Sequence, residues 1–315
     1  MHVFFVIDAG KYEWQSVLLT ASLRQFASGV EHVTAFVPQR RVSVISPKVL
    51  AFQERMGVAI DTLQDNDAFF ASRYDHGNKV LAAQAMSGRG DALFLDTDTV
   101  FCRETDVSVA LGEAFLAGVS TKGQLWATRK TAKWAELLNA AGYPPSDGEA
   151  LEQTLPHLNG GVIFFRDQRV FGPTGDQTLG EAWLDMASRI DRLEFQDRRP
   201  WVDQLSLCIV ARMLPPESVR TLDDSWNHSL VNDLEPLRSM PKILHYHGGN
   251  RTHKLRRNLG MGIVNMLLRD DEDFGDINDL VALSMETQAR HIQFKEEAGI
   301  DVGANARRHK RWNKG

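Results

Sequence analysis

The chain has 315 residues, 43% hydrophobic and 24% charged, and this composition excludes a disordered or low-complexity protein. Its 41 acidic residues outnumber its 36 basic ones, and the net charge of -5 gives no reason to expect a nucleic-acid partner. The two cysteines, Cys102 and Cys208, lie in separate apolar stretches without a CxxC motif. We therefore expect buried thiols in a reducing compartment and no zinc site.

The N-terminal half alternates short apolar runs with amphipathic stretches. Strands are predicted at residues 3–7 and 33–37, with a helix over 17–26 between them. A second helix is predicted after Asp75, and Gly88 and Gly90 end it before an apolar strand at 92–95. This βαβ alternation is typical of an α/β fold.

The second half is less regular. Strands are predicted at residues 115–120, 158–165 and 242–246, and helices at 131–141 and 201–213. The composition changes beyond residue 250, so we expect a catalytic domain over 1–250 and a helical C-terminal extension with a basic tail over 251–315. The N-terminus lacks the features of a signal peptide, and no run approaches about 18 apolar residues, which predicts a cytoplasmic protein.

The triplet Asp96-Thr97-Asp98 directly follows the apolar run 92–95. In an extended strand alternate side chains point the same way, so the two carboxylates would share one side, roughly 7 Å apart at the backbone. Hard oxygen ligands of this kind suit Mg²⁺ or Mn²⁺ bridging a diphosphate. The triplet alone fits several α/β chemistries, because their sites commonly lie at strand ends.

Further motifs accompany the triplet in a fixed order along the chain. They are Val6-Ile7-Asp8-Ala9-Gly10-Lys11-Tyr12, Lys79, Leu158-Asn159-Gly160-Gly161, Asp203-Gln204, Trp226-Asn227 and Ile243-Leu244-His245-Tyr246-His247-Gly248. With the triplet, this set resembles the retaining glycosyltransferases of the glycogenin and lipopolysaccharide galactosyltransferase family, family 8. The resemblance spans about residues 3–251 and implies the GT-A fold, a Rossmann-like mixed sheet flanked by helices. It also implies transfer of a hexose from a nucleotide diphosphate sugar, with UDP as the expected nucleotide.

The resemblance assigns several residues to the donor. Asp8 is expected near the base with Tyr12 beside it, and Lys79 is expected to reach the diphosphate. Gly248 and Arg251 belong to the same donor-binding group. Arg251 stands where the family has a lysine followed by Pro-Trp, and this departure leaves the closing segment and the acceptor type open.

A second group is expected around the transferred sugar. By the resemblance, Asp203 accepts hydrogen bonds from sugar hydroxyls, and Asn159 offers a carbonyl and an amide to them. Gln204 is expected beside the anomeric carbon. An uncharged amide is a poor nucleophile, so we expect same-face attack by the acceptor, with retention, in preference to a covalent enzyme intermediate.

The histidines near the end of the predicted strand 242–246 complete the expected metal site. Imidazole is an acceptable ligand for Mn²⁺, and the resemblance favours His245 as the third protein ligand beside Asp96 and Asp98. His247 shares a face with His245 and is the competing ligand. The expected cofactor is Mn²⁺ or Mg²⁺.

Two other interpretations of the triplet stay open at this point. The first is a haloacid-dehalogenase-type phosphatase with Asp96 as nucleophile and Asp98 as general acid/base, whose last acidic motif would be at residues 275–279. That motif normally lies near the start of its domain, and the spacing to Asp279 is one residue short. The second is a non-catalytic sugar-nucleotide-binding protein.

The C-terminal residues 307–314 place basic side chains around one tryptophan, Trp312. This mixture favours anionic membrane surfaces, so peripheral contact with the inner face of a membrane is one expectation. A solvated terminus is the alternative. The acceptor, whether a saccharide, a lipid-linked sugar or a protein, is not predicted by the sequence.

Overall fold

The computed structural model describes residues 1–121, 131–151, 155–172, 174–194, 198–229 and 241–246. The predicted C-terminal extension, residues 251–315, lies outside this part of the chain, so the division into 1–250 and 251–315 stays a prediction. Within the described ranges no helix is both long and apolar enough to cross a membrane.

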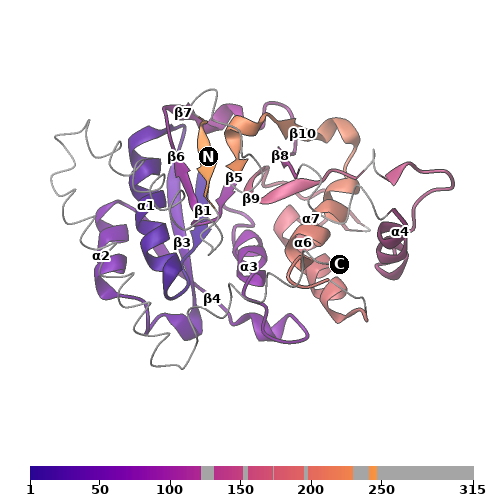
Figure 1. Cartoon of the computed structure of the whole chain (residues 1–315), viewed down its shortest axis with the longest axis horizontal. Coiled ribbons are helices and arrows are strands. Elements are labelled where there is room, and N and C mark those ends of the chain that lie inside the picture. The colour runs from indigo at the N-terminus through magenta and orange to yellow at the C-terminus, as the bar shows by residue number, and fades with distance from the viewer. Residues whose placement is uncertain (122–130, 152–154, 173, 195–197, 230–240, 247–315) are drawn as a thin grey trace, which may run out of the picture.

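A seven-stranded mixed sheet forms the centre of the fold (Figure 1). In spatial order its strands are β10 (Val219–Leu222), β8 (Leu116–Ser120), β9 (Leu158–Phe165), β5 (Ala92–Leu95), β1 (His2–Val6), β3 (His32–Pro38) and β4 (Ala59–Leu63). Strand β9 is antiparallel to both of its neighbours, and the other pairs are parallel. The predicted α/β class and mixed sheet are confirmed.

Both faces of this sheet are covered, which explains why its inner strands β1 and β5 are almost continuously apolar. Along β1 the side chains alternate between two cores: Phe4 belongs to one, and Val3 and Phe5 belong to the other. The Phe4 core includes residues of α3 (Gly77–Ala85), α4 (Thr131–Ala140), α6 (Leu179–Arg192) and α7 (Val202–Arg212). The opposite core includes residues of α1 (Lys11–Phe26) and α2 (Pro47–Arg55).

Helix α6 packs closely on α3. Its N-terminus carries a capping box, in which the Thr178 hydroxyl accepts from the Glu181 amide and the Glu181 carboxylate accepts from the Thr178 amide. A Cβ on Gly180 would lie 2.2 Å from the Ala83 carbonyl oxygen of α3, so only glycine permits this approach. The glycine thus sets how closely α6 approaches the helix that carries Lys79.

Two smaller sheets accompany the large one. A three-stranded sheet has the order β11 (His228–Ser229), β12 (Ile243–His245) and β6 (Thr99–Phe101), and β2 (Ala27–Ser28) pairs with β7 (Thr105–Asp106). The strand predicted at 242–246 is therefore present as β12, but it lies outside the large sheet. It runs antiparallel to β6, with His245 opposite Thr99.

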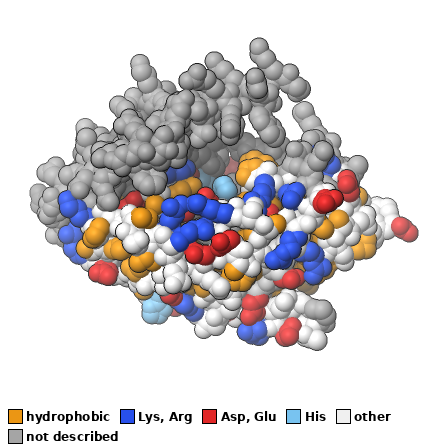
Figure 2. All heavy atoms as spheres, turned by 90° about the horizontal axis from the view of Figure 1, so that it is seen from below, with side chains coloured by type: hydrophobic (Ala, Val, Ile, Leu, Met, Phe, Trp, Pro, Cys, Tyr) orange, Lys and Arg blue, Asp and Glu red, His pale blue; other side chains and the backbone are white. Residues whose placement is uncertain are grey.

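The surface is highly charged. Figure 2 shows Lys and Arg side chains beside Asp and Glu side chains on one face of the described part of the molecule. The exposed ion pairs include Arg73–Asp75, at 2.7 Å, and Arg89–Asp61, at 2.8 Å. Pairs of this kind contribute little to stability in water.

Candidate active site

The triplet Asp96-Thr97-Asp98 forms a turn that joins the large sheet to the three-stranded sheet. Strand β5 ends at Leu95 and β6 begins at Thr99, whose amide and hydroxyl both donate to the Asp96 carbonyl, at 3.1 and 2.7 Å. The expectation of an extended strand at the triplet was wrong. The two carboxylates reach one place because the chain turns there, and not through strand alternation.

His245 meets both carboxylates from the neighbouring strand. Because β12 pairs with β6, the Tyr246 amide donates to the Asp98 carbonyl at 3.0 Å, which holds the strand end beside the turn. Nε2 of His245 lies 3.0 Å from Oδ1 of Asp98 and 4.0 Å from Oδ2 of Asp96. One ligand atom from each of the three residues lies within 4.8 Å of the other two.

The His245 ring is oriented from behind by two residues. Its Nδ1 lies 3.1 Å from Oδ1 of the buried Asn227. Its edge rests on Gly161, where a Cβ would be only 2.4 Å from Cε1 of the ring. The absence of a side chain at Gly161 thus makes room for the imidazole.

The contacts of His245 fit a bound cation. A neutral imidazole carries one N–H, and here both ring nitrogens face oxygen atoms. With the N–H on Nδ1 donated to Asn227, the Nε2 lone pair faces the Asp98 carboxylate. The lone pair and the carboxylate repel each other, and a cation between them would relieve that repulsion. A metal-binding histidine usually donates the N–H of its other ring nitrogen to a hydrogen-bond acceptor, as Nδ1 would here.

Lys79 is buried between Asp96 and Asp203. Its Nζ lies 2.9 and 3.1 Å from the two carboxylate oxygens of Asp96, 3.3 Å from Oδ2 of Asp203 and 3.3 Å from the Gly160 carbonyl. Burial by itself lowers the pKa of this ammonium, but the charges of Asp96 and Asp203 outweigh burial and raise the pKa above its ordinary value. Lys79 therefore stays charged and links the metal-site carboxylate to Asp203.

The predicted sugar-binding residues lie on the other side of Lys79. Asp203, in the first turn of α7, is 3% exposed. A Cβ on Gly160 would lie 3.5 Å from Cγ of Gln204 and 3.8 Å from Oδ2 of Asp203, so β9 and α7 meet there. Oδ1 of Asn159 accepts from the Gly161 amide at 2.8 Å, which fixes its side chain.

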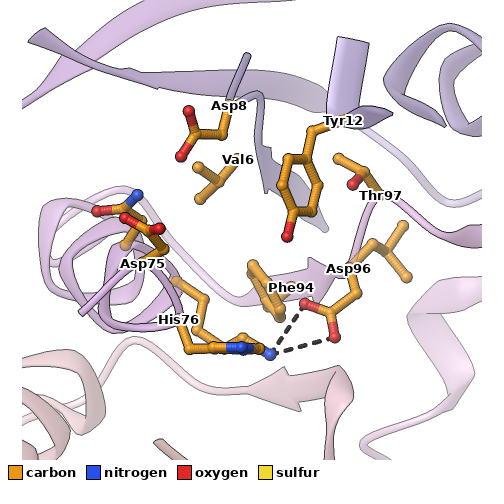
Figure 3. A pocket seen from close by; sticks show the side chains of 11 residues that line it. Val6, Asp8, Tyr12, Asp75, His76, Phe94, Asp96 and Thr97 are labelled. Atoms are coloured by element: carbon orange, nitrogen blue, oxygen red, sulfur yellow. Dashed lines mark hydrogen bonds and ion pairs between the residues drawn. The ribbon is translucent and has the colours of Figure 1, made fainter. Parts of the chain in front are cut away.

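A pocket opens in front of Lys79 and Asp96. Asp8, Tyr12, Thr97 and Asp75 are among its lining residues, and in Figure 3 the Tyr12 ring stands between Asp8 and Asp96. The dashed lines in Figure 3 mark the contacts of Asp96 with the Lys79 ammonium. Burial and then the surrounding aspartates, Asp98 foremost, raise the pKa of Tyr12, which keeps its phenol protonated.

Of the predicted site residues that the structure describes, Asp8, Tyr12, Lys79 and Asp96 line the pocket. The others, Asp98, Asn159, Asp203, Gln204 and His245, lie around Lys79, Asp96 and the backbone of Gly160 and Gly161. The remaining predicted residues, His247, Gly248 and Arg251, lie outside the described residues, as does the basic tail. Of the two competing histidines, the structure describes only His245, and which of them ligates the metal stays a prediction.

Sequence reasoning missed two neighbours of the site. Arg41 places its Nε 2.9 Å from Oδ1 of Asp8, and Tyr74 places its hydroxyl 2.6 Å from Oδ1 of Asp203. Both contacts join residues far apart in the chain, so no motif spacing could reveal them. Helix α6 was also missed, although its Thr178-x-x-Glu181 capping box is a recognisable start signal.

Structural comparison places this architecture among known glycosyltransferases. The apo structure of the bifunctional glycosyltransferase WbbM has a TM-score of 0.53 and 15% sequence identity, over 89% of this chain and 51% of WbbM. This chain therefore spans about half the length of WbbM.

The galactosyltransferase LgtC, in complex with donor and acceptor sugar analogs, has a TM-score of 0.52 and 15% identity, over 88% of this chain and 100% of LgtC. An active-site mutant of LgtC has a TM-score of 0.51 and 14% identity over the same shares. No curated protein sequence matches the chain.

The fold is therefore that of the GT-A glycosyltransferases. The chain belongs to the family described as the Rhodobacterales glycosyltransferase domain, whose sequence model matches residues 3–214. The predicted GT-A glycosyltransferase is confirmed. The phosphatase and non-catalytic alternatives are not supported, and residues 275–279, the possible last acidic motif of a phosphatase, lie outside the described residues.

Proposed function

We propose that this glycosyltransferase transfers a hexose from a nucleotide diphosphate sugar, with UDP as the expected nucleotide, and that it depends on Mn²⁺ or Mg²⁺. One observation carries the proposal: ligand atoms of Asp96, Asp98 and His245 converge within 4.8 Å, and Asp96 also lines the pocket. A divalent cation there would supply positive charge to the diphosphate as the glycosidic bond breaks. The donor set of two carboxylates and one imidazole suits Mn²⁺.

The protein's own side chains would hold the donor on both sides of that position. Asp8 and Tyr12 line the same pocket as Lys79 and Asp96, and they are proposed to lie beside the base. Asp203, Asn159 and Gln204 lie beyond Lys79 and are proposed to bind the transferred sugar. The Lys79 ammonium is balanced by two carboxylates, so it is suited to holding Asp96 and Asp203 in place as well as to facing a phosphate.

Retention of the anomeric configuration is proposed through same-face attack by the acceptor hydroxyl. In the described structure Gln204 is an uncharged neighbour of this region, and the Asp203 carboxylate is already paired with Lys79 and Tyr74. Neither side chain is arranged as a free nucleophile. The acceptor is proposed to be a saccharide hydroxyl, whether free, lipid-linked or on a protein.

The test is donor turnover. The purified protein is incubated with a panel of UDP-, GDP- and dTDP-sugars with Mn²⁺, and release of the nucleotide diphosphate is measured. We expect one donor to be hydrolysed slowly without acceptor, and we expect chelation to abolish the activity and Mn²⁺ to restore it. Asp98→Asn and His245→Ala should each lower the rate at least about 100-fold, as losing a principal electrostatic contact does.

A matched control is Asp185→Asn, which removes an exposed carboxylate on α6 whose side chain pairs only with the exposed Arg189 in the described structure. It should keep the wild-type rate. The proposal is lost if no nucleotide sugar is bound or hydrolysed, or if His245→Ala retains full activity with Mn²⁺.

A further inference from the structure

The Asp203 carboxylate is held by one partner on each oxygen. Its Oδ2 lies 3.3 Å from Nζ of Lys79, and its Oδ1 accepts a hydrogen bond of 2.6 Å from the Tyr74 hydroxyl. Both Asp203 and Tyr74 are nearly inaccessible to solvent, at 3% and 4% exposure. The orientation of this carboxylate is therefore fixed by side chains and not by water.

The Tyr74 hydroxyl is itself fixed against the start of α7. It accepts from the Asp203 backbone amide at 3.2 Å, and the Pro200 carbonyl lies 2.7 Å away. Burial, followed by the Asp203 charge, raises the pKa of Tyr74, so its proton is kept for donation. One phenol thus contacts both the backbone and the side chain of Asp203.

Arg199 holds the Tyr74 ring from the other side. Its guanidinium lies over the ring at 5.2 Å and forms a bidentate pair with the fully buried Asp191, at 2.7 and 2.8 Å. Two further N–H groups donate to the carbonyls of Ser72 and Arg73, at 2.8 and 2.9 Å. The segment that leads into Tyr74 is thereby tied to the segment that leads into Asp203.

We propose that Tyr74 is a positioning residue of the transfer reaction: it directs the Asp203 carboxylate toward Lys79 and the sugar site, and the Arg199–Asp191 pair keeps Tyr74 in place. This inference rests on the proposed function and adds to it a residue outside every motif of the sequence. Tyr74 acts through Asp203 and does not itself touch the donor. Its loss should therefore lower the rate of transfer and leave donor and metal binding intact.

The test is Tyr74→Phe, which removes one oxygen and keeps the ring under Arg199. We expect kcat to fall about 10- to 100-fold, the scale of a misplacement near 1 Å, while the donor KM and the Mn²⁺ affinity stay within about twofold of wild type. Tyr143→Phe is the matched control: this half-buried tyrosine follows α4 and does not line the pocket, so the variant should keep the wild-type kcat.

A second variant protects the test against simple misfolding. Arg199→Lys keeps the positive charge but loses the bidentate pair. It should also lower kcat at unchanged KM, but by a smaller factor than Tyr74→Phe. The inference is overturned if Tyr74→Phe keeps the wild-type kcat, or if its kcat falls only in step with the folded fraction measured by circular dichroism. A wild-type protein that turns over no nucleotide sugar overturns the proposed function, and this inference falls with it.

Discussion

The ring of His245 lies directly against the backbone of Gly161, with Cε1 of the histidine only 2.4 Å from where a Cβ would stand. The neighbouring Gly160 has no such restriction, because a Cβ there would meet nothing closer than 3.5 Å. There is therefore room for a side chain at Gly160 but not at Gly161.

Gly161→Ala should weaken the metal site. The added methyl group displaces the imidazole, so we expect Mn²⁺ affinity, measured by titration calorimetry, to fall about 10- to 100-fold, as it does when a ligand loses its orientation. Gly160→Ala is the control and should bind Mn²⁺ as the wild type does. Equal affinities in the two variants would show that His245 does not ligate the ion.

Asn227→Ala should have a related but separable effect. Asn227 faces Nδ1 of His245 at 3.1 Å, and its loss frees the ring to turn without adding bulk. We expect Mn²⁺ affinity about 10- to 100-fold lower, with thermal stability in the absence of metal changed less than in Gly161→Ala. Asn139→Ala, at an exposed position of α4, is the control. Unchanged affinity in Asn227→Ala would remove the proposed role of this contact.

Gly180→Ala should destabilise the fold itself. The new Cβ would lie 2.2 Å from a backbone oxygen of α3, which cannot move aside as a flexible side chain can. We expect a loss of about 1–3 kcal/mol in the free energy of unfolding, measured by urea denaturation. Ser188→Ala, on the same helix, should change stability by far less. An unchanged midpoint in Gly180→Ala would contradict the close approach of α3 and α6.

Alkaline pH should destabilise the protein through its two buried thiols. Burial raises the pKa of Cys102 and Cys208 to about 12, from an ordinary value of 9.0. Between these values the unfolded chain loses thiol protons that the native state keeps, so the native state binds more protons and stability falls as pH rises.

The expected slope is at most about 1.4 kcal/mol per pH unit for each thiol. Urea denaturation between pH 9 and 11 measures it, and Cys208→Ala should show a shallower decline than the wild type, because it keeps only the Cys102 contribution. Parallel declines in the two proteins would mean that Cys208 is not the source.

Much of the fold could be predicted from the sequence, because strands that are buried on both faces appear as apolar runs. The predicted strands 92–95 and 158–165 coincide with β5 and β9. Strand order was not readable, because pairing depends on contacts distant in sequence. The predicted strand at 242–246 is an example, because it forms β12 and pairs with β6 beside the triplet, outside the large sheet.

At the site, the residue types and their order could be predicted from the sequence, but the contacts between these residues could not. Lys79 was expected on the diphosphate, yet its ammonium also bridges Asp96 and Asp203, which lie 17 and 124 positions further along the chain. Tyr74 lies in no motif at all. Such contacts follow from the packing of α3 against α7 and of α7 against β9, which no local pattern encodes.

The turn at Asp96-Thr97-Asp98 has a mechanical consequence. Asp96 follows the last residue of β5 in the large sheet, whereas Asp98 precedes β6 and His245 ends β12, both in the small sheet. An ion held by all three would cross-link the two sheets. Ligand binding would then oppose local opening of the small sheet, by about 2.7 kcal/mol at a hundredfold excess over Kd. Amide exchange in β6 and β12 would consequently report metal occupancy even in the absence of any sugar.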